Sequence, residues 1–315
     1  MLEGDFYESV LIPPANDGCS LYIVSGYATS AMAARHIKDI VDREFREIDI
    51  RLIIGMTAKD GIGETNHRGF CSLVKDSGIK SFQCAYVPDG KPPVHTKAYA
   101  WFHGENPLCG YIGSANYTQT GFFSNQKEAM EKSDPREILN YYKTVQETAT
   151  FCDHQDMLGL VRDDKRSLSR PDTDDLESRV AGQNTVAYTL LDRSGNLPER
   201  SGLNWGQRPD ANRELNQAYI RVPSDVQEAE FFPPRGYYFS MHTDDGQMFI
   251  CSVRQEKGKA IHSSQNNSLL GEYFRRRLGV PLGEKIEKSH LEKYGRTDIT
   301  FYKIDDENYM MDFSV

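Results

Sequence analysis

The amino-acid sequence predicts two domains of different class, an α/β domain followed by a mainly β domain shaped as a small barrel. Over the first half, short apolar runs alternate with helical patterns, whereas the second half consists of short β-rich runs separated by turns. A charged stretch at residues 162–177 lies between them and is typical of a linker. A chain of 315 residues is long enough for two cores, and we expect domains at residues 1–170 and 171–315.

The first half predicts strands that are separated by helices. We expect strands at residues 21–25, 51–56 and 81–87, helices at residues 31–45 and 67–75, and two more strands at residues 94–101 and 108–112. Residues 103–107 between these last two strands are typical of a hairpin turn. Alternating strands and helices indicate a largely parallel sheet that is covered on both faces.

The second half predicts short strands at residues 188–191, 218–222, 237–241, 248–253, 300–304 and 309–313. Asp244-Asp245-Gly246 predicts a hairpin turn, and the last two strands are expected to form a terminal hairpin. One amphipathic helix is expected at residues 268–278. These elements predict a small barrel with a helix or two.

Composition restricts the class of protein. The formal net charge is -9, which is not typical of a protein that coats DNA without sequence preference. Six scattered cysteines form no C-x-x-C pair, so we expect reduced thiols in the cytoplasm. Residues 1–10 lack the features of a signal peptide, and no apolar run is long enough to span a bilayer. We therefore expect neither a secreted lipase nor a membrane partner.

The most informative residues form the pattern H-x-K followed by G-S-x-N. They are His95 and Lys97, then Gly113, Ser114, Ala115 and Asn116. On a strand, His95 and Lys97 point to the same face, and the next strand delivers Ser114 and Asn116 to the same rim. An imidazole can attack phosphorus, while an ammonium and an amide hold the non-bridging oxygens as charge builds on them. The pattern therefore predicts phosphodiester cleavage by nucleophilic catalysis, without a metal or another cofactor.

This constellation resembles the phospholipase D superfamily, with two departures. Phe102 stands where the usual Asp would be, and the interval before Gly113 is longer. The resemblance implies that a later glutamate orients the histidine, and Glu128 is the candidate, with Glu131 as the alternative. Residues 25–27 end the first strand and either line the site or form a plain strand-to-helix turn.

Only one copy of the pattern is present. His290 and Lys293 do not form a second copy, because their spacing differs and no G-S-x-N follows. Phospholipase D chemistry needs two imidazoles, one to attack and one to protonate the leaving oxygen. A chain with one such histidine can supply both by pairing with itself about a two-fold axis. We therefore predict a homodimer through the first domain, with one site shared by two His95 rings.

Five segments of the second half resemble the NgoFVII-like type II restriction endonucleases. They are residues 202–208, 218–220, 231–233, 271–279 and 294–298. Those proteins join a phospholipase-D-like nuclease domain to a DNA-binding pseudobarrel of the plant B-three type. The resemblance covers essentially the whole chain and implies sequence-specific cleavage of double-stranded DNA.

The same resemblance implies two arms that grip the major groove. The first should include Asn204, Trp205, Gln207, Arg208 and Arg213. The second should lie near His262, Ser263, Ser264, Gln265, Asn266 and Asn267. Arg can pair with guanine, and Asn or Gln with adenine, while Lys257 and Lys259 are candidate phosphate contacts. Trp205 is equally compatible with packing, and residues 275–277 are compatible with the wet face of a helix.

Three other functions share parts of this pattern. The catalytic signature also fits a phospholipase D-type lipid enzyme, which the β-rich second half disfavours. Intact His95, Lys97 and Asn116 disfavour a catalytically silent DNA-binding regulator. Some relatives act only with an ATP-driven helicase-like subunit, which would be another polypeptide, because this chain has no G-x-x-x-x-G-K-[ST] motif. No carboxylate cluster resembles a two-metal nuclease site, so we expect cleavage to survive a chelator.

Overall fold

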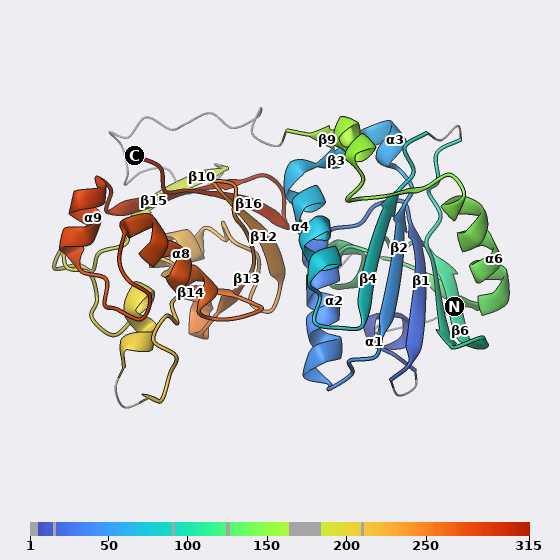
Figure 1. Cartoon of the computed structure of the whole chain (residues 1–315), viewed down its shortest axis with the longest axis horizontal. Helices are drawn as coiled ribbons and strands as arrows, with labels where there is room; N and C mark the ends of the chain where they lie inside the picture. Colours follow the sequence, from blue (N-terminus) through green and yellow to red (C-terminus); the bar gives the residue numbers. More distant parts are fainter. Residues whose placement is uncertain (1–5, 15–16, 90–91, 124–126, 164–183, 209–210) are drawn as a thin grey trace. The chain divides into compact units, whose positions relative to one another are not determined.

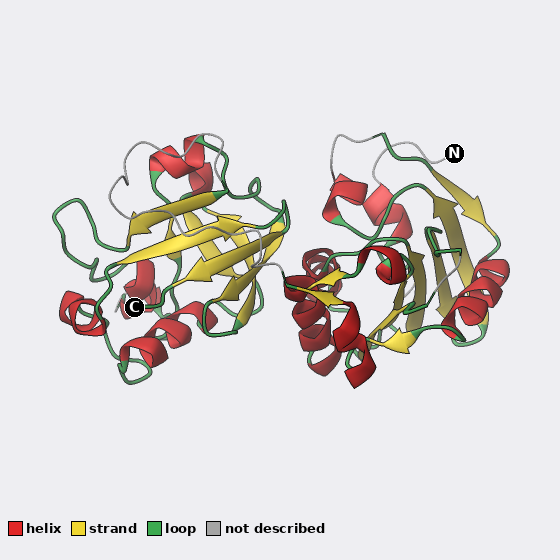
Figure 2. Cartoon of the chain, turned by 90° about the horizontal axis from the view of Figure 1, so that it is seen from above, coloured by secondary structure: helices red, strands yellow, loops and turns green. Residues whose placement is uncertain are grey.

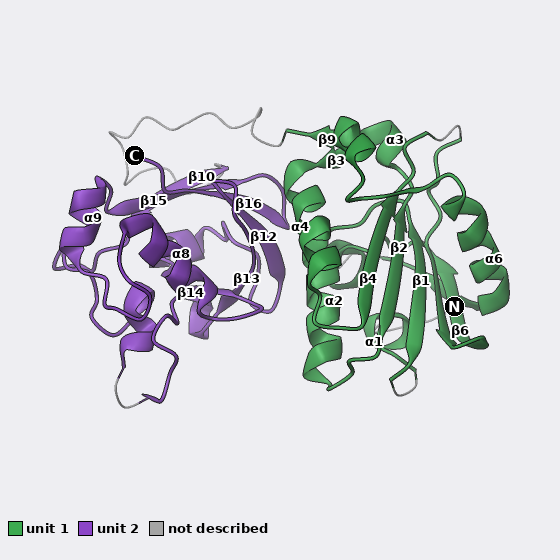
Figure 3. Ribbon diagram, viewed as in Figure 1, with its two compact units in different colours: residues 1–164 green, residues 165–315 purple. Residues whose placement is uncertain are grey.

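The computed structural model describes residues 6–14, 17–89, 92–123, 127–163, 184–208 and 211–315. The chain divides into two compact units at residues 1–164 and 165–315 (Figures 1 and 3). Each unit has its own seven-stranded sheet. The domain boundary expected near residue 170, and most of the predicted linker, lie outside the described residues.

The first unit is a sheet covered by helices. Its strands are β1 (Cys19–Ser25), β2 (Asp49–Ile54), β3 (Ile62–Gly63), β4 (Ser81–Tyr86), β5 (Ala98–His103), β6 (Asn106–Gly113), β7 (Met130–Ser133), β8 (Thr150–Phe151) and β9 (Val161–Arg162). Its helices are α1 (Phe6–Val10), α2 (Ser30–Asp42), α3 (Thr57–Asp60), α4 (Glu64–Lys75), α5 (Gln119–Phe123), α6 (Pro135–Gln146) and the 3-10 helix η1 (Gln155–Leu160). Helices α2 and α4 pack on one face of the sheet and α6 on the other (Figure 1). The predicted strands and helices of this half are therefore confirmed within a few residues.

The sheet of the first unit is mixed, so the prediction of a largely parallel sheet is wrong. Its order is β7-β6-β5-β1-β2-β4-β8. Strands β1, β2 and β4 are parallel, but β5 runs antiparallel to β1, and β6 and β7 continue the antiparallel part. A parallel strand needs a crossover connection, and the described residues between β4 and β5 form no helix. The β5–β6 hairpin therefore returns in the opposite direction on the far side of β1.

This topology brings four chain segments to one edge of the sheet. Ala98, at the start of β5, lies opposite Val24 near the end of β1. Ala98 also lies opposite Ile112 near the end of β6, and Gly113 lies opposite Met130 at the start of β7. The residues after β1, before β5, after β6 and before β7 therefore meet. The expected strand at residues 94–101 begins only at Ala98, so His95 and Lys97 precede it.

The second unit is a seven-stranded sheet with helices, shown in Figure 2. Its strands are β10 (Thr185–Thr189), β11 (Ile220–Arg221), β12 (Tyr238–Thr243), β13 (Met248–Arg254), β14 (Ala260–Ser263), β15 (Asp298–Lys303) and β16 (Asn308–Asp312). Its helices are α7 (Ser224–Glu228), α8 (Leu269–Leu278), α9 (Lys288–Tyr294) and the 3-10 helices η3 (Gly202–Gln207) and η5 (Glu256–Gly258). The strand order is β10-β15-β16-β12-β13-β14-β11. All six predicted strands and both hairpins are present, and β14, α7, α9 and the two 3-10 helices are additional.

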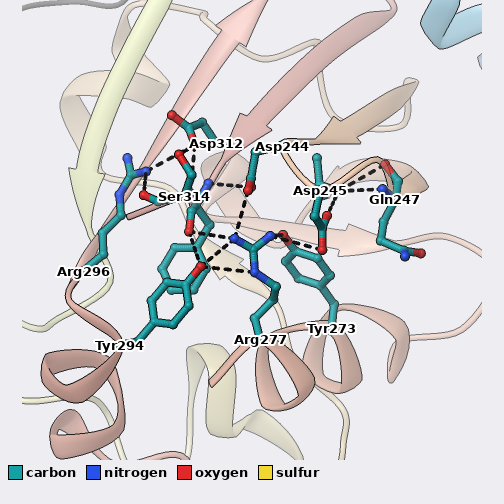
Figure 4. Close-up of polar contacts among 11 residues, drawn as sticks. Asp244, Asp245, Gln247, Tyr273, Arg277, Tyr294, Arg296, Asp312 and Ser314 are labelled. Atoms are coloured by element: carbon teal, nitrogen blue, oxygen red, sulfur yellow. Dashed lines mark hydrogen bonds and ion pairs between the residues drawn. The ribbon is translucent and has the colours of Figure 1, made fainter. Parts of the chain in front are cut away.

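The arginines of α8 hold the second unit together, which corrects the expectation of a wet helix face at residues 275–277. Arg277 forms ion pairs with Asp244 and Asp245 in the β12–β13 turn, at 2.9 and 3.1 Å (Figure 4). Arg275 is fully buried and donates from Nε to the carbonyl of Glu284 at 2.7 Å. Only Arg276 is largely exposed. Burial of such cations is tolerated because their donors are satisfied.

Candidate functional site

His95 and Lys97 lie together at the edge where the four segments meet. His95 is exposed and Lys97 is buried. The Lys97 Nζ lies 3.0 Å from Nδ1 and 3.1 Å from Nε2 of His95, and it donates to the His95 carbonyl at 2.7 Å. Nearly equal distances to both ring nitrogens place the ammonium over the ring and not along either lone pair. Lys97 therefore contacts one face of the imidazole, and His95 as a whole residue remains exposed.

Asn116 is fixed to the end of β1. Its Oδ1 accepts from the Tyr27 backbone N–H at 3.1 Å, and Ser25 Oγ accepts from the Tyr117 N–H at 2.9 Å. Since Oδ1 is engaged, the amide NH₂ of Asn116 is the end left for a ligand. Of the two alternatives for residues 25–27, the structure therefore places them against the predicted site.

Three glycines allow these segments to approach closely. A Cβ on Gly26 would lie 2.8 Å from Cδ2 of His95. A Cβ on Gly113 would lie 2.0 Å from the Ala129 carbonyl oxygen, and one on Gly121 would lie 2.4 Å from the Asn116 carbonyl oxygen. Atoms cannot approach so closely, so the His95 ring would have to move at Gly26 and the backbone at Gly113 and Gly121. The glycine of the G-S-x-N pattern therefore keeps β6 against β7.

Glu128 contacts Ser114 and not the histidine. Its carboxylate accepts a short hydrogen bond from Ser114 Oγ, which in turn accepts from the Ala129 N–H at 2.9 Å. No hydrogen bond within the described parts of the chain joins Glu128 to His95. The alternative residue, Glu131, lies opposite Ile112 in the β6–β7 pair and is exposed. Strand alternation places Glu131 on the face of Ala98, away from His95 and Lys97.

The site carries two opposed electrostatic influences. Burial lowers the pKa of Lys97, and the nearby Glu128 carboxylate acts against that shift. The arrangement offers an exposed nucleophilic imidazole, an ammonium and an amide NH₂ within one small area, as phosphoryl transfer requires. Over the residues that the structure describes, no group of three or more His, Cys, Asp or Glu side chains is placed to bind a metal ion. No helix in these residues is long and apolar enough to cross a bilayer.

Two residues of the expected first arm are structural. Asn204 is fully buried, where its Nδ2 donates to the carbonyls of Pro198 and Ile286 and its Oδ1 accepts from the Ile286 N–H. Gln207 donates to the carbonyls of Leu215 and Gly283, both at 3.0 Å. These amides have no free donors to offer a base, so the base-reading assignment of Asn204 and Gln207 is corrected. Side-chain identity alone did not reveal this burial.

The other residues of that arm surround an aromatic cluster. The Trp205 ring packs edge-on against Tyr219 and His262, and the Arg213 guanidinium lies 4.0 Å from the Trp205 ring centroid. Burial lowers the pKa of His262 to about 4, which keeps that ring neutral. Trp205 is thus at least partly a packing residue. Arg208 is exposed, and its guanidinium forms no hydrogen bond or ion pair with another described residue.

The expected second arm is mostly engaged within the unit. His262 and Ser263 belong to β14 and are buried. The backbone N–H of Ser264 donates to the Ile250 carbonyl, Asn266 Oδ1 accepts from the Ser268 N–H, and the Asn267 carbonyl accepts from the Ala218 N–H. Gln265 and Asn266 are exposed. Both therefore keep an amide NH₂ group that can reach a base edge.

Lys257 and Lys259 line a hollow of about 830 Å³ in the second unit. Arg193 and Arg221 line it as well, so four basic side chains face two acidic ones, Asp192 and Glu228. The sequence interpretation missed both arginines. A signal for Arg221 existed, because it stands between buried Ile220 and Val222 and strand alternation points it outward.

The loop at residues 255–259 beside this hollow has an unusual backbone. Gln255 has φ 65° and ψ 167°, and Lys257 has φ 58°. Non-glycine residues pay about 1–3 kcal/mol for such conformations, which persist mainly at functional sites. Gln255 lines the hollow with Lys257 and was also missed. Its left-handed φ cannot be read from sequence.

Family comparisons match both halves of the chain. Residues 5–159 match the NgoFVII restriction endonuclease N-terminal PLD domain. Residues 178–305 match the NgoFVII C-terminal B3-like DNA-binding domain. The predicted fold class is therefore confirmed, a phospholipase-D-like α/β domain followed by a mainly β, half-barrel DNA-binding domain.

A comparison with solved structures also gave matches. Nuc from Salmonella typhimurium, a phospholipase D family member, is 14% identical over 45% of this chain and 86% of its own, with a TM-score of 0.34. NucT from Helicobacter pylori is 17% identical over 42% of this chain and 81% of its own, with a TM-score of 0.30. Polyphosphate kinase from Porphyromonas gingivalis is 15% identical over 43% of this chain and 19% of its own, with a TM-score of 0.30. A search of curated proteins gave no match.

Proposed function

The chain belongs to the NgoFVII restriction endonuclease family, and from that premise we propose that it is a type II restriction enzyme. It cleaves double-stranded DNA at a specific sequence, as a homodimer in the cytoplasm. The observation that carries this proposal is that His95, Lys97 and Asn116 lie close together in a domain of the PLD type. A B3-like DNA-binding domain in the same chain favours duplex DNA over a phospholipid substrate.

The cleavage begins when a nitrogen of His95 attacks the scissile phosphorus. A phosphorus–nitrogen bond forms as the phosphorus–oxygen bond to the leaving strand breaks. Lys97 and the Asn116 NH₂ group stabilise the charge on the non-bridging oxygens, as fixed donors do for oxyanions in other enzymes. Water then attacks the phosphohistidine, which releases the second product and restores the imidazole. No metal ion takes part in either step.

The second proton-transfer group is His95 of the partner subunit. It protonates the departing oxygen and then takes a proton from the attacking water. The chain has eight histidines, and the other seven have other surroundings. His36 and His67 are buried against tyrosines, His242 and His262 are buried in the second unit, and His290 caps α9. His103 ends β5, remote from its start, and His154 caps η1. A second copy of the chain supplies the missing ring.

Ser114 and Glu128 support this chemistry indirectly. Their hydrogen bond, with the Ala129 N–H, anchors the loop that carries Asn116 to the start of β7. Ser114 is exposed, so its hydroxyl can also approach a phosphate oxygen. The orienting role expected for Glu128 thus acts through the loop, with the histidine ring held by other groups.

DNA recognition takes place at the basic hollow of the second unit. Lys257, Lys259, Arg193 and Arg221 contact phosphates, which position the duplex without reading its sequence. Arg208, Gln255, Gln265 and Asn266 are exposed side chains suited to base edges in the major groove. Arg213 lies over the Trp205 ring, which packs against Tyr219 in the lining of the hollow.

Digestion of a long supercoiled plasmid in EDTA tests this function. We expect the wild-type chain to cut it and the mapped ends to share one sequence context. His95→Ala should abolish cutting, while the control His103→Ala, which removes another exposed histidine of the same domain, should leave it intact. Loss of cutting in chelator, or full activity of His95→Ala, would overturn the mechanism. Cutting that requires ATP and a second polypeptide would instead identify the chain as the nuclease subunit of a larger complex.

A further inference from the structure

Tyr27 is an aromatic residue at the candidate site whose ring is not buried in the core. Its exposed fraction is 41%. The Tyr27 hydroxyl donates to Asp60 Oδ2 at 2.7 Å. Tyr27 follows β1 and Asp60 ends α3, so this bond joins two elements. The backbone is held as well, because the Tyr27 carbonyl accepts from Ser25 Oγ at 2.6 Å and the N–H donates to Asn116. Both ends of this residue are therefore fixed.

The ring of Tyr27 lies against the ring of His95. The centroids are 5.8 Å apart and the planes meet at 81°, an edge-to-face arrangement. The Lys97 ammonium and the backbone of Gly26 also lie next to the imidazole. In the described residues no carboxylate or carbonyl accepts a hydrogen bond from a His95 ring nitrogen. Contacts with these neighbours, and not a hydrogen bond to an acceptor, therefore hold the His95 ring.

We propose that Tyr27, anchored by Asp60, is a positioning residue that fixes the orientation of the His95 ring for attack. This inference rests on the proposed function, in which His95 is the nucleophile. An exposed side chain can sweep through several rotamers, whereas one tied at its hydroxyl cannot. The anchored Tyr27 ring limits the rotation of the imidazole. The attacking nitrogen of His95 therefore stays aligned with the phosphorus and the leaving oxygen.

Stability alone does not account for this arrangement. A ring with 41% exposure removes little apolar surface from water, and a solvent-exposed hydrogen bond to Asp60 contributes little to folding. The hydroxyl–carboxylate bond instead directs the ring toward the histidine. Asp60 belongs to another element and has no direct contact with His95, so its influence passes through Tyr27.

A double-mutant cycle tests this coupling by single-turnover cleavage of a duplex oligonucleotide that carries the mapped site. Tyr27→Phe and Asp60→Ala each remove the anchor, so each should lower the cleavage rate by on the order of 10-fold. The double variant should be no slower than either single variant. Asp60→Asn keeps an acceptor and should restore most of the rate. Tyr27→Ala removes the ring itself and should lower the cleavage rate by about 100-fold, with KM nearly unchanged.

The matched control is Tyr141→Phe, since Tyr141 is exposed to 38% and its hydroxyl also has one side-chain partner, Thr96. It should cleave at the wild-type rate. NMR gives a readout without catalysis: in Asp60→Ala, which keeps the Tyr27 ring, the chemical shift of the His95 Cε1–H signal should change, with the His103 signal as internal reference. Additive losses in the cycle, or an unchanged His95 signal, would overturn the positioning role. Absence of cleavage by the wild-type chain would overturn the proposed function instead, and the NMR result would still decide the role of Tyr27.

Discussion

Gly26→Ala tests the position of the catalytic histidine with a single methyl group. The new Cβ would lie 2.8 Å from Cδ2 of His95 and 3.4 Å from Oδ1 of Asn116. Carbon atoms pack at about 3.5–4.0 Å, so the imidazole must move by roughly 0.7–1.2 Å. A displacement of about 1 Å at a reacting group costs on the order of 100-fold in rate, or about 2.7 kcal/mol in activation free energy. We therefore expect single-turnover cleavage of a duplex to slow by about two orders of magnitude.

The same substitution should leave folding intact. The backbone of Gly26 is not in the left-handed region, and the exposed His95 ring can move aside into solvent. Restricting the unfolded chain even stabilises such variants by about 0.4–1 kcal/mol. Gly159→Ala is the control, because a Cβ there meets no atom within 4 Å. Its cleavage rate should match the wild type, and its melting temperature should be equal to that of the wild type or slightly higher. Full activity of Gly26→Ala would refute the placement of His95 as the attacking group.

Three further predictions concern the other residues discussed above. Asn204→Ala should lower the free energy of unfolding, measured in urea, by about 2–4 kcal/mol, because three backbone groups lose their hydrogen bonds. The control Arg208→Ala should change the free energy of unfolding by less than about 0.5 kcal/mol. Equal stability of the two variants would contradict the structural role of Asn204. Burial lowers the pKa of His36 to about 4 from an ordinary 6.5, so the unfolded chain binds the extra proton first as pH falls. The stability that neutral His36 contributes is thus complete above pH 6.5 and is lost progressively toward pH 4, by about 2 kcal/mol at pH 5. His36→Gln should flatten the dependence of the urea midpoint on pH between pH 6.5 and pH 4. An unchanged slope would show that His36 is not the source of this pH dependence. Lys257→Ala and Lys259→Ala should each reduce the slope of the logarithm of the duplex-binding constant against log salt by about 0.9. The control Lys288→Ala, at a partly exposed lysine of α9, should leave that slope unchanged. Identical slopes for all three variants would show that the hollow does not bind DNA.

The grouping of the candidate site residues followed from the sequence more directly than the direction of the strands did. His95, Lys97, Ser114 and Asn116 stand next to the ends of two strands of one hairpin, which must lie side by side even though β5 begins only at Ala98. Strand direction is a different matter, because it depends on where the chain crosses the sheet. The absence of a helical pattern before β5 was the available signal for an antiparallel return.

Recognition residues were the hardest to predict because polarity does not reveal burial. Asn204, Gln207 and Arg275 have the side chains of DNA readers, yet each satisfies backbone groups inside the second unit. Arg221 and Gln255, in contrast, reach the hollow from a short strand and from a strained loop. Such placement arises from tertiary packing, which overrides local preference.

A covalent adduct on His95 tests the central claim most directly. Wild-type protein would be mixed with a duplex carrying its site in EDTA, quenched within the first turnover, and digested for mass spectrometry. We predict a nucleotide phosphate bound to the peptide that contains His95, formed before product and absent from His95→Ala. Product that accumulates with no such adduct, or an adduct on Ser114 in place of His95, would contradict the account.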